Sequence, residues 1–168
     1  MIECKKATPA DAGVLAETRR IVWLETYRGI YPDELLDEYD VSLYAMRDRE
    51  HIEDARQHYY LFVEKDVCVG YFSYGPYHYG SYKDFEVCLN HLYIRDGYKG
   101  LGLGRRAIEQ LSEFCREQHI DRFFCGCNFH NKAAMSFYKH MGGVMGDCPQ
   151  LHQHKNDDIV HFEFYIGD

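Results

Sequence analysis

The sequence lacks long apolar runs and has few positive charges for its size. No stretch approaches the ~20 consecutive apolar residues of a membrane-spanning helix, and the opening MIECKK has no apolar core of a signal peptide. Lys and Arg number 19 against 27 Asp and Glu, a formal charge of −8. Proteins that bind nucleic acids gather basic residues to displace counterions, so we expect no nucleic-acid partner. We expect a soluble, cytoplasmic protein with no membrane partner.

The seven cysteines form neither a disulfide framework nor a metal site by their spacing. Their number is odd and most lie in apolar runs, which is typical of a reducing compartment. Cys125 and Cys127 have no second pair at a zinc spacing, which favours buried structural thiols. Cys148, His152, His154 and His161 are more simply explained as residues of a polar loop and its edge. We therefore expect no metal.

Helical and strand patterns alternate along the whole chain of 168 residues, which has the length of one ordinary domain. Apolar residues at three- and four-residue spacing and proline at helix starts predict helices over 12–28, 32–39, 43–58, 103–118 and 131–141. Runs of β-branched and aromatic residues predict strands over 2–6, 59–64, 67–74, 85–95, 122–127 and 159–166. The stretch 75–84, rich in glycine and aromatic residues, is predicted to be a loop.

A glycine-rich turn, Lys99-Gly100-Leu101-Gly102-Leu103-Gly104, joins a strand to a helix. Such a turn points several backbone N–H groups at one place, where the helix dipole favours an anion. Glycines let phosphates approach the backbone, and Lys99 and Arg105 add positive charge. The turn predicts a phosphate site. A tight turn that only packs a helix on a strand is the alternative for the pattern taken alone.

Two commoner phosphate motifs fit the turn poorly. A P-loop needs Gly-Lys followed by Ser or Thr, where this chain has Gly104-Arg105-Arg106. A dinucleotide fingerprint is met only in part, through Gly102, Gly104 and Ala107, and the turn lies mid-chain after antiparallel strands. The acid expected about 20 residues further on would be Asp121, which precedes the next strand instead of following it.

Two segments resemble motifs of the GNAT acetyltransferases. Residues 92–105 (LYIRDGYKGLGLGR) resemble the family's main acetyl-CoA-binding motif, with Lys99 where Arg or Gln is usual. Residues 131–142 (NKAAMSFYKHMG) resemble the Asn-x-x-Ala-x-x-x-Tyr-x-x-x-Gly helix, followed by Gly143 where an aromatic residue is usual. The resemblance implies an acetyl-CoA-dependent N-acetyltransferase in one domain, 1–168. It implies an α/β fold with a mixed, mostly antiparallel, bent sheet of six to seven strands, about four helices, and a splay between the strands ending near Arg95 and Cys127.

The resemblance also implies a cosubstrate site and a general acid. Tyr138 matches the acid that protonates the departing thiolate, a helix tyrosine packed in the core being the alternative. A backbone N–H near Tyr93 and Ile94 would polarise the acyl carbonyl, and Asn131 would hydrogen-bond the pantetheine arm or the nearby loop. The residues expected to contact acetyl-CoA are Leu92, Tyr93, Ile94, Lys99, Gly100, Leu101, Gly102, Leu103, Gly104, Arg105, Asn131, Ala134 and Phe137.

The general base has two candidates. Alternation along the strand places Glu86 on the same face as Cys88, and Glu86 is the carboxylate nearest the expected position. His91, on the other face, is the second candidate because its ordinary pKa is near 6.5. Each also has a purely structural reading, and a chain of water molecules can replace a single base.

The acceptor is expected to be the primary amine of a small molecule or a peptide. The segment 23–32 resembles the variable helical region that covers the acceptor in this family, so Trp23, Tyr27 and Tyr31 are expected to line the pocket. Tyr74 is expected there too, because it begins the tyrosine-rich loop 74–82. The negative charge hints at a small cationic amine. A non-catalytic acyl-CoA sensor that binds partners is the alternative function. Homodimer formation stays open because many family members pair.

Overall fold

The computed structural model describes residues 1–147 and 150–167. The chain order of its elements is β1 (Glu3–Lys6), α1 (Ala12–Thr26), α2 (Asp33–Asp37), α3 (Val41–Glu53), β2 (His58–Glu64), β3 (Val67–Gly75), β4 (Cys88–Ile94), α4 (Leu103–Glu117), β5 (Arg122–Asn128), α5 (Lys132–His140), β6 (Val144–Met145) and β7 (Ile159–Tyr165). Short 3-10 turns lie at Pro9–Asp11, Asp96–Tyr98 and Lys155–Asp157. The expected α/β fold is confirmed. The described residues form five α-helices, where about four were expected.

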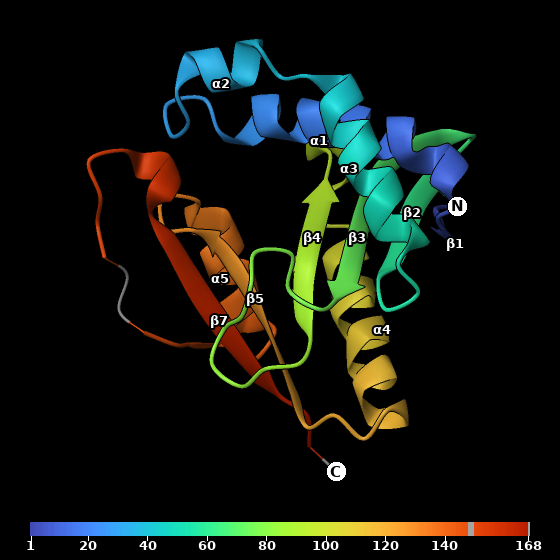
Figure 1. Ribbon diagram of the computed structural model, residues 1–168, viewed down its shortest axis with the longest axis vertical. Coiled ribbons are helices and arrows are strands. Elements are labelled where there is room, and N and C mark those ends of the chain that lie inside the picture. The colour runs from blue at the N-terminus through green and yellow to red at the C-terminus, as the bar shows by residue number, and fades with distance from the viewer. Residues whose placement is uncertain (148–149, 168) are drawn as a thin grey trace.

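The strands form one mixed, mostly antiparallel sheet in the order β1-β2-β3-β4-β5-β7-β6 (Figure 1). Every neighbouring pair is antiparallel except β4 and β5, which run parallel. The seventh strand, β6, is only two residues long, too short to show an alternating pattern in the sequence. None of the helices in the described ranges is both long and apolar enough to cross a membrane.

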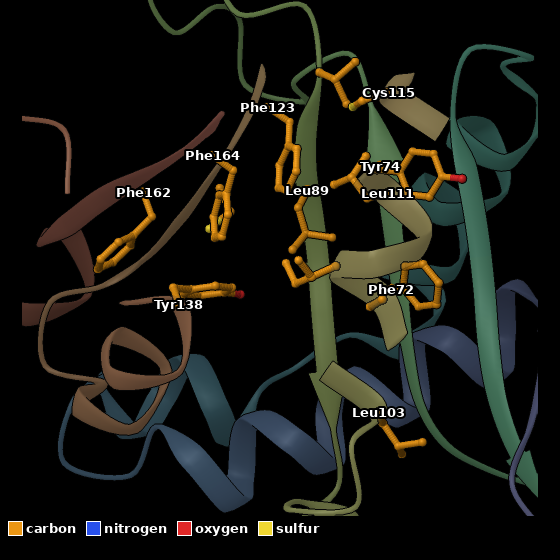
Figure 2. Packing of buried hydrophobic residues seen from close by; sticks show 14 of the residues in the cluster. Phe72, Tyr74, Leu89, Leu103, Leu111, Cys115, Phe123, Tyr138, Phe162 and Phe164 are labelled. Atoms are coloured by element: carbon orange, nitrogen blue, oxygen red, sulfur yellow. The ribbon is translucent and has the colours of Figure 1, made fainter. Parts of the chain in front are cut away.

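Alternation along β2 and β3 gives the sheet two apolar faces. Leu61 and Tyr71 pack with Leu15 of α1 on one face, whereas Phe62 and Phe72 pack with residues of α4 on the other. Helices α1 and α3 therefore cover one face and α4 the opposite one, as Figure 1 shows. Figure 2 shows the cluster on the α4 face, where each large side chain contributes about 1.5–3 kcal/mol by leaving water.

The sheet opens between β4 and β5. Only two residue pairs, Cys88 with Phe124 and Leu89 with Cys125, join these strands, and beyond them the strands separate. On its other edge β4 carries a bulge at Asn90, because His91 pairs with Ser73 and Leu89 already with Tyr74. The predicted splay is confirmed, although the strand predicted from residue 85 begins only at Cys88.

Candidate active site

A cleft of about 590 Å³ lies in the opening between β4 and β5. Its borders are β4, the glycine turn, the first turn of α4, the face of α5 and the C-terminal end of α1. The expected site residues that line it are Tyr27, His91, Leu92, Tyr93, Ile94, Lys99, Gly100, Gly102, Leu103, Gly104, Arg105, Asn131, Ala134, Phe137 and Tyr138. The structure thus brings both motif segments together around one cavity.

The glycine turn exposes a row of backbone donors. Gly100 and Gly102 have φ of +76° and +81°, a left-handed conformation that only glycine adopts without strain. The first backbone bond into α4 is donated by Arg106 to the Gly102 carbonyl, 3.0 Å away. Within residues 1–147 and 150–167, the N–H groups from Gly100 to Arg105 have no backbone acceptor. Free N–H groups at a helix N-terminus form a site for an anion.

The third glycine has a different role. Gly104 lies in the first turn of α4, and a β-carbon there would be 2.7 Å from Cζ of Phe137. The absence of a side chain at Gly104 allows α4 to pack closely on α5. Gly104 thus serves helix packing, whereas Gly100 and Gly102 shape the turn. Lys99 Nζ lies 2.5 Å from Asp96 Oδ1 at the rim of the turn. Leu101 is 60% exposed and does not line the cleft.

Tyr138 belongs both to the core and to the cleft. It is 7% exposed and packs in the large apolar cluster, while Figure 2 shows its hydroxyl on the side that faces β4. Burial, with smaller effects of the Cys125 and Cys127 thiols, raises the pKa of Tyr138 well above its ordinary value. The phenol therefore stays protonated at neutral pH and can donate a proton or hydrogen bond into the cleft.

The cleft edge of β4 offers unpaired backbone groups. Arg95 N donates to Val69 O of β3 at 3.0 Å, and a β-carbon on Gly70 of β3 would meet Tyr93 O at 2.6 Å. Tyr93 therefore turns its peptide groups toward β3. By alternation, Leu92 and Ile94 turn theirs toward the cleft, where β5 no longer pairs. The backbone N–H of Ile94 thus faces the cleft, where it could donate to an acyl carbonyl, whereas the N–H of Tyr93 faces β3.

Asn131 forms the N-cap of α5. Its Oδ1 accepts from Ala134 N at 3.1 Å, so the Asn-x-x-Ala spacing is a capping pattern. The cap fixes the start of the helix that carries Phe137 and Tyr138.

His91 lies in the cleft but its imidazole nitrogens are both engaged. Nδ1 is 2.8 Å from Ser73 Oγ, and Nε2 is 3.4 Å from NH2 of Arg19. Burial, Arg19 and His78 lower the pKa of His91 well below its ordinary value. A histidine in this state is a weak base.

The remaining expected residues lie outside the cleft. Glu86 is exposed in the loop before β4, because the strand starts three residues later than predicted. Tyr74 is 2% exposed in the core on the α4 face, as its alternation with Phe72 requires. Trp23 packs against an aromatic group that includes Tyr31, which stacks on the cleft residue Tyr27 at 4.2 Å.

Three residues at or near the cleft were not among the expected site residues. Asn90 holds the adjacent loop, donating to Pro76 O at 3.0 Å and accepting from His78 N at 3.1 Å. Cys127 lines the cleft, and burial raises the pKa of its thiol to about 12. Arg19 is buried behind β4, and its place on the apolar stripe of α1 was the available signal.

The cleft is locally positive although the chain is negative. Lys99 and Arg105 line it, and none of the described residues lining it is Asp or Glu. Throughout the described ranges, no group of three His, Cys, Asp or Glu side chains is arranged to hold a metal ion. Cys148, considered above with the histidines of the last loop, lies outside the described residues.

The known proteins that are similar to this chain are acetyltransferases. Residues 17–142 match the Acetyltransferase (GNAT) family. The L-methionine sulfoximine/L-methionine sulfone acetyltransferase of Pseudomonas aeruginosa is 30% identical over 104 residues, which cover 59% of this chain and 59% of that protein. The chain therefore matches less than two thirds of the length of this curated relative.

Solved structures share the fold. The PaiA N-acetyltransferase of Thermoplasma acidophilum, in complex with coenzyme A, superposes with a TM-score of 0.80 at 18% identity, covering 98% of this chain and 99% of that one. YncA of Salmonella typhimurium, with its cofactor acetyl-CoA, gives 0.72 at 19% identity, covering 100% and 95%. Because the family match spans most of the sequence, the chain belongs to the acetyltransferase (GNAT) family.

Proposed function

We propose that the protein is an N-acetyltransferase that moves an acetyl group from acetyl-CoA to the primary amine of a small molecule. The observation that carries the proposal is the cleft itself, which places the free N–H groups after Gly100 and the buried hydroxyl of Tyr138 around one cavity. The solved relatives named above with coenzyme A or acetyl-CoA support the choice of cosubstrate.

The residues present suit this cosubstrate. The turn around Gly100 and Gly102 would hold the pyrophosphate through backbone N–H groups, with Lys99 and Arg105 at its rim. Leu92 and Ile94 would present peptide groups to the pantetheine arm and the acyl carbonyl. The residues from Asn131 to Phe137 would line the other side.

The transfer needs one bond formed and one broken. The amine nitrogen attacks the thioester carbonyl carbon, and the carbon–sulfur bond breaks. The sulfur takes a proton from Tyr138, which regains one released by the amine. The transfer converts ammonium and thioester to amide, free thiol and one proton in solution.

The acceptor is proposed to be a small amine whose remainder is not strongly cationic. The net charge of −8 suggested a cationic amine, but a polyamine would find no carboxylate among the described residues lining the cleft. The Pseudomonas relative is named for two amino-acid-type substrates. An amino acid, with one amine beside an anionic group, fits the local charge better, and a peptide amine is the second choice.

The test has two stages. Thermal unfolding is measured with acetyl-CoA, NAD and ATP, since a ligand at 100 times its Kd adds about 2.7 kcal/mol of stability. Thiol release is then followed with L-methionine sulfone, spermidine and a short peptide as acceptors. A shift with NAD or ATP alone would contradict the cosubstrate. Binding of acetyl-CoA without turnover on any amine would favour a non-catalytic sensor.

A further inference from the structure

A buried ion pair behind β4 has no place in the transfer step described above. Arg19 of α1 is 4% exposed and Asp48 of α3 is 1% exposed, with NH2 and Oδ1 2.6 Å apart. Nε of Arg19 also donates to the Tyr71 hydroxyl at 2.8 Å. Buried ion pairs often contribute no more stability than apolar side chains of similar volume. Stability alone therefore does not account for this pair.

The same guanidinium fixes the protonation pattern of His91. NH2 of Arg19 lies 3.4 Å from Nε2 of His91, and an arginine nitrogen can only donate. The contact therefore favours the tautomer in which Nε2 is unprotonated. The ring proton is then on Nδ1, which donates to Ser73 Oγ at 2.8 Å.

Several groups surround the His91 ring, and most are neutral at pH 7. The titratable and charged side chains near it are Arg19 from α1, Asp48 and His51 from α3, Tyr59 from β2, Tyr71 from β3, Tyr93 from β4 itself and His78 from the loop before β4. Asp48 forms an ion pair with Arg19 and has no bond to His91. The charged group in contact with Nε2 of His91 is therefore the Arg19 guanidinium. Protonation of Nε2 would place two cations in contact.

We propose that Arg19 is a positioning residue that withholds His91 from proton transfer and leaves solvent water to take the proton of the acceptor ammonium. The proposal rests on the acetyl transfer proposed above. The ammonium loses one proton to water and becomes the nucleophile. Its second proton follows after attack and restores Tyr138. No described residue lining the cleft is a carboxylate that could replace His91 in this role.

The first experiment measures the protonation state of the His91 ring directly and does not require enzyme activity. Ring ¹⁵N signals of the full chain are recorded between about pH 5.5 and 8.5, where an ordinary histidine titrates. His91→Gln identifies the signals that belong to this ring. We expect the Nδ1–H tautomer with no titration over the range. A titrating ring, or an Nε2–H tautomer, would overturn the proposal whether or not the protein transfers acetyl groups.

The second experiment removes both charges together as Arg19→Met/Asp48→Asn, so that neither is left buried and unpaired. The exposed Arg47 of α3 provides the matched control, Arg47→Met. Burial still lowers the pKa of His91 in the double variant, but without the Arg19 cation this pKa should rise, so that the ring titrates within the measured range. The pH profile of kcat/KM should gain an inflection there that wild type and control lack. If the double variant folds and His91 stays silent in it, Arg19 is not the cause. If it does not fold, the wild-type ring signals still decide.

Discussion

A β-carbon on Gly104 would lie 2.7 Å from Cζ of Phe137, so the first turn of α4 and the middle of α5 are in close contact. Gly104 ends the turn proposed to hold the pyrophosphate, and Phe137 precedes the proposed acid Tyr138. One packing contact therefore sets the spacing between the anion site and the acid.

Gly104→Ala should lower the free energy of unfolding by about 1–2 kcal/mol, because overpacking at Phe137 exceeds the gain in helix propensity. Gly13→Ala is the control: Gly13 is also in the first turn of a helix, but its β-carbon would meet nothing within 4 Å. That variant should gain up to about 1 kcal/mol. Urea unfolding checks both. If both changes stabilised the protein equally, the Phe137 ring would move aside without cost. Adding Phe137→Leu to Gly104→Ala should restore the lost free energy of unfolding.

Tyr138→Phe should lower kcat by about 10²-fold or more while Kd for acetyl-CoA stays nearly the same, because only the proton donor is lost. Thiol release and calorimetric titration measure the two quantities. Tyr60→Phe removes a hydroxyl on β2, which does not line the cleft, and should keep kcat within about twofold of wild type. An unaltered kcat in Tyr138→Phe would remove this residue from the mechanism.

Asp48→Ala should destabilise the protein by about 3–5 kcal/mol, because it leaves the Arg19 cation buried without its partner. Asp37→Ala removes an exposed partner of Arg28, which keeps Asp33, and should leave the denaturant midpoint nearly unchanged because water screens the pair. Denaturant midpoints compare the two variants. If Asp48→Ala lowered the free energy of unfolding only slightly, water would have to reach the Arg19 guanidinium in the variant.

Stability should decline as pH falls below about 6.5. Burial, His51 and Arg19 lower the pKa of His78 to about 3 in the folded state. The unfolded chain binds a proton at this site near its ordinary pKa, so unfolding takes up protons throughout the interval from 6.5 downward. Each such proton changes the free energy of unfolding by about 1.4 kcal/mol per pH unit.

His78→Gln should therefore reduce the slope of unfolding free energy against pH by about one proton. His119→Gln, at an exposed position, is the matched control and should keep the wild-type slope. Unfolding in urea at several pH values between about 5 and 6.5 gives the slopes. A slope unaffected by His78→Gln would show that this ring is protonated in the folded protein.

Features carried by local sequence were predictable. The glycine turn depends on neighbours within one motif, and the helix that begins at Asn131 and carries Tyr138 depends on neighbours within the other. Gly100, Gly102, Gly104, Asn131 and Tyr138 all line the cleft. The splay followed from the family resemblance rather than from periodicity. It is confirmed because β4 and β5 pair over two residues only.

Features that depend on distant residues were not predictable. The basicity of His91 depends on Arg19, which is 72 positions away. The position of Glu86 depended on where β4 begins, and no local signal separates its first residues from the preceding loop. Tyr74 lies next to the tyrosine-rich loop and was assigned to the pocket for that reason, although alternation with Phe72 already indicated the core face.

Because only two residue pairs join β4 to β5, the contacts of the loop before β4 add to the shared apolar core in holding the two halves of the sheet together. One part of this loop is held on the β4 side, where Gln57 Nε2 and Asn90 Nδ2 both donate to Pro76 O at 2.8 and 3.0 Å. Another part is held on the far side, where Tyr82 donates to Glu163 of β7 at 2.9 Å and Lys83 pairs with the same carboxylate. The loop thus joins both sides of the opening from outside the cleft, so we expect substitutions at Glu163 to alter the proposed transfer without removing a group that contacts either substrate.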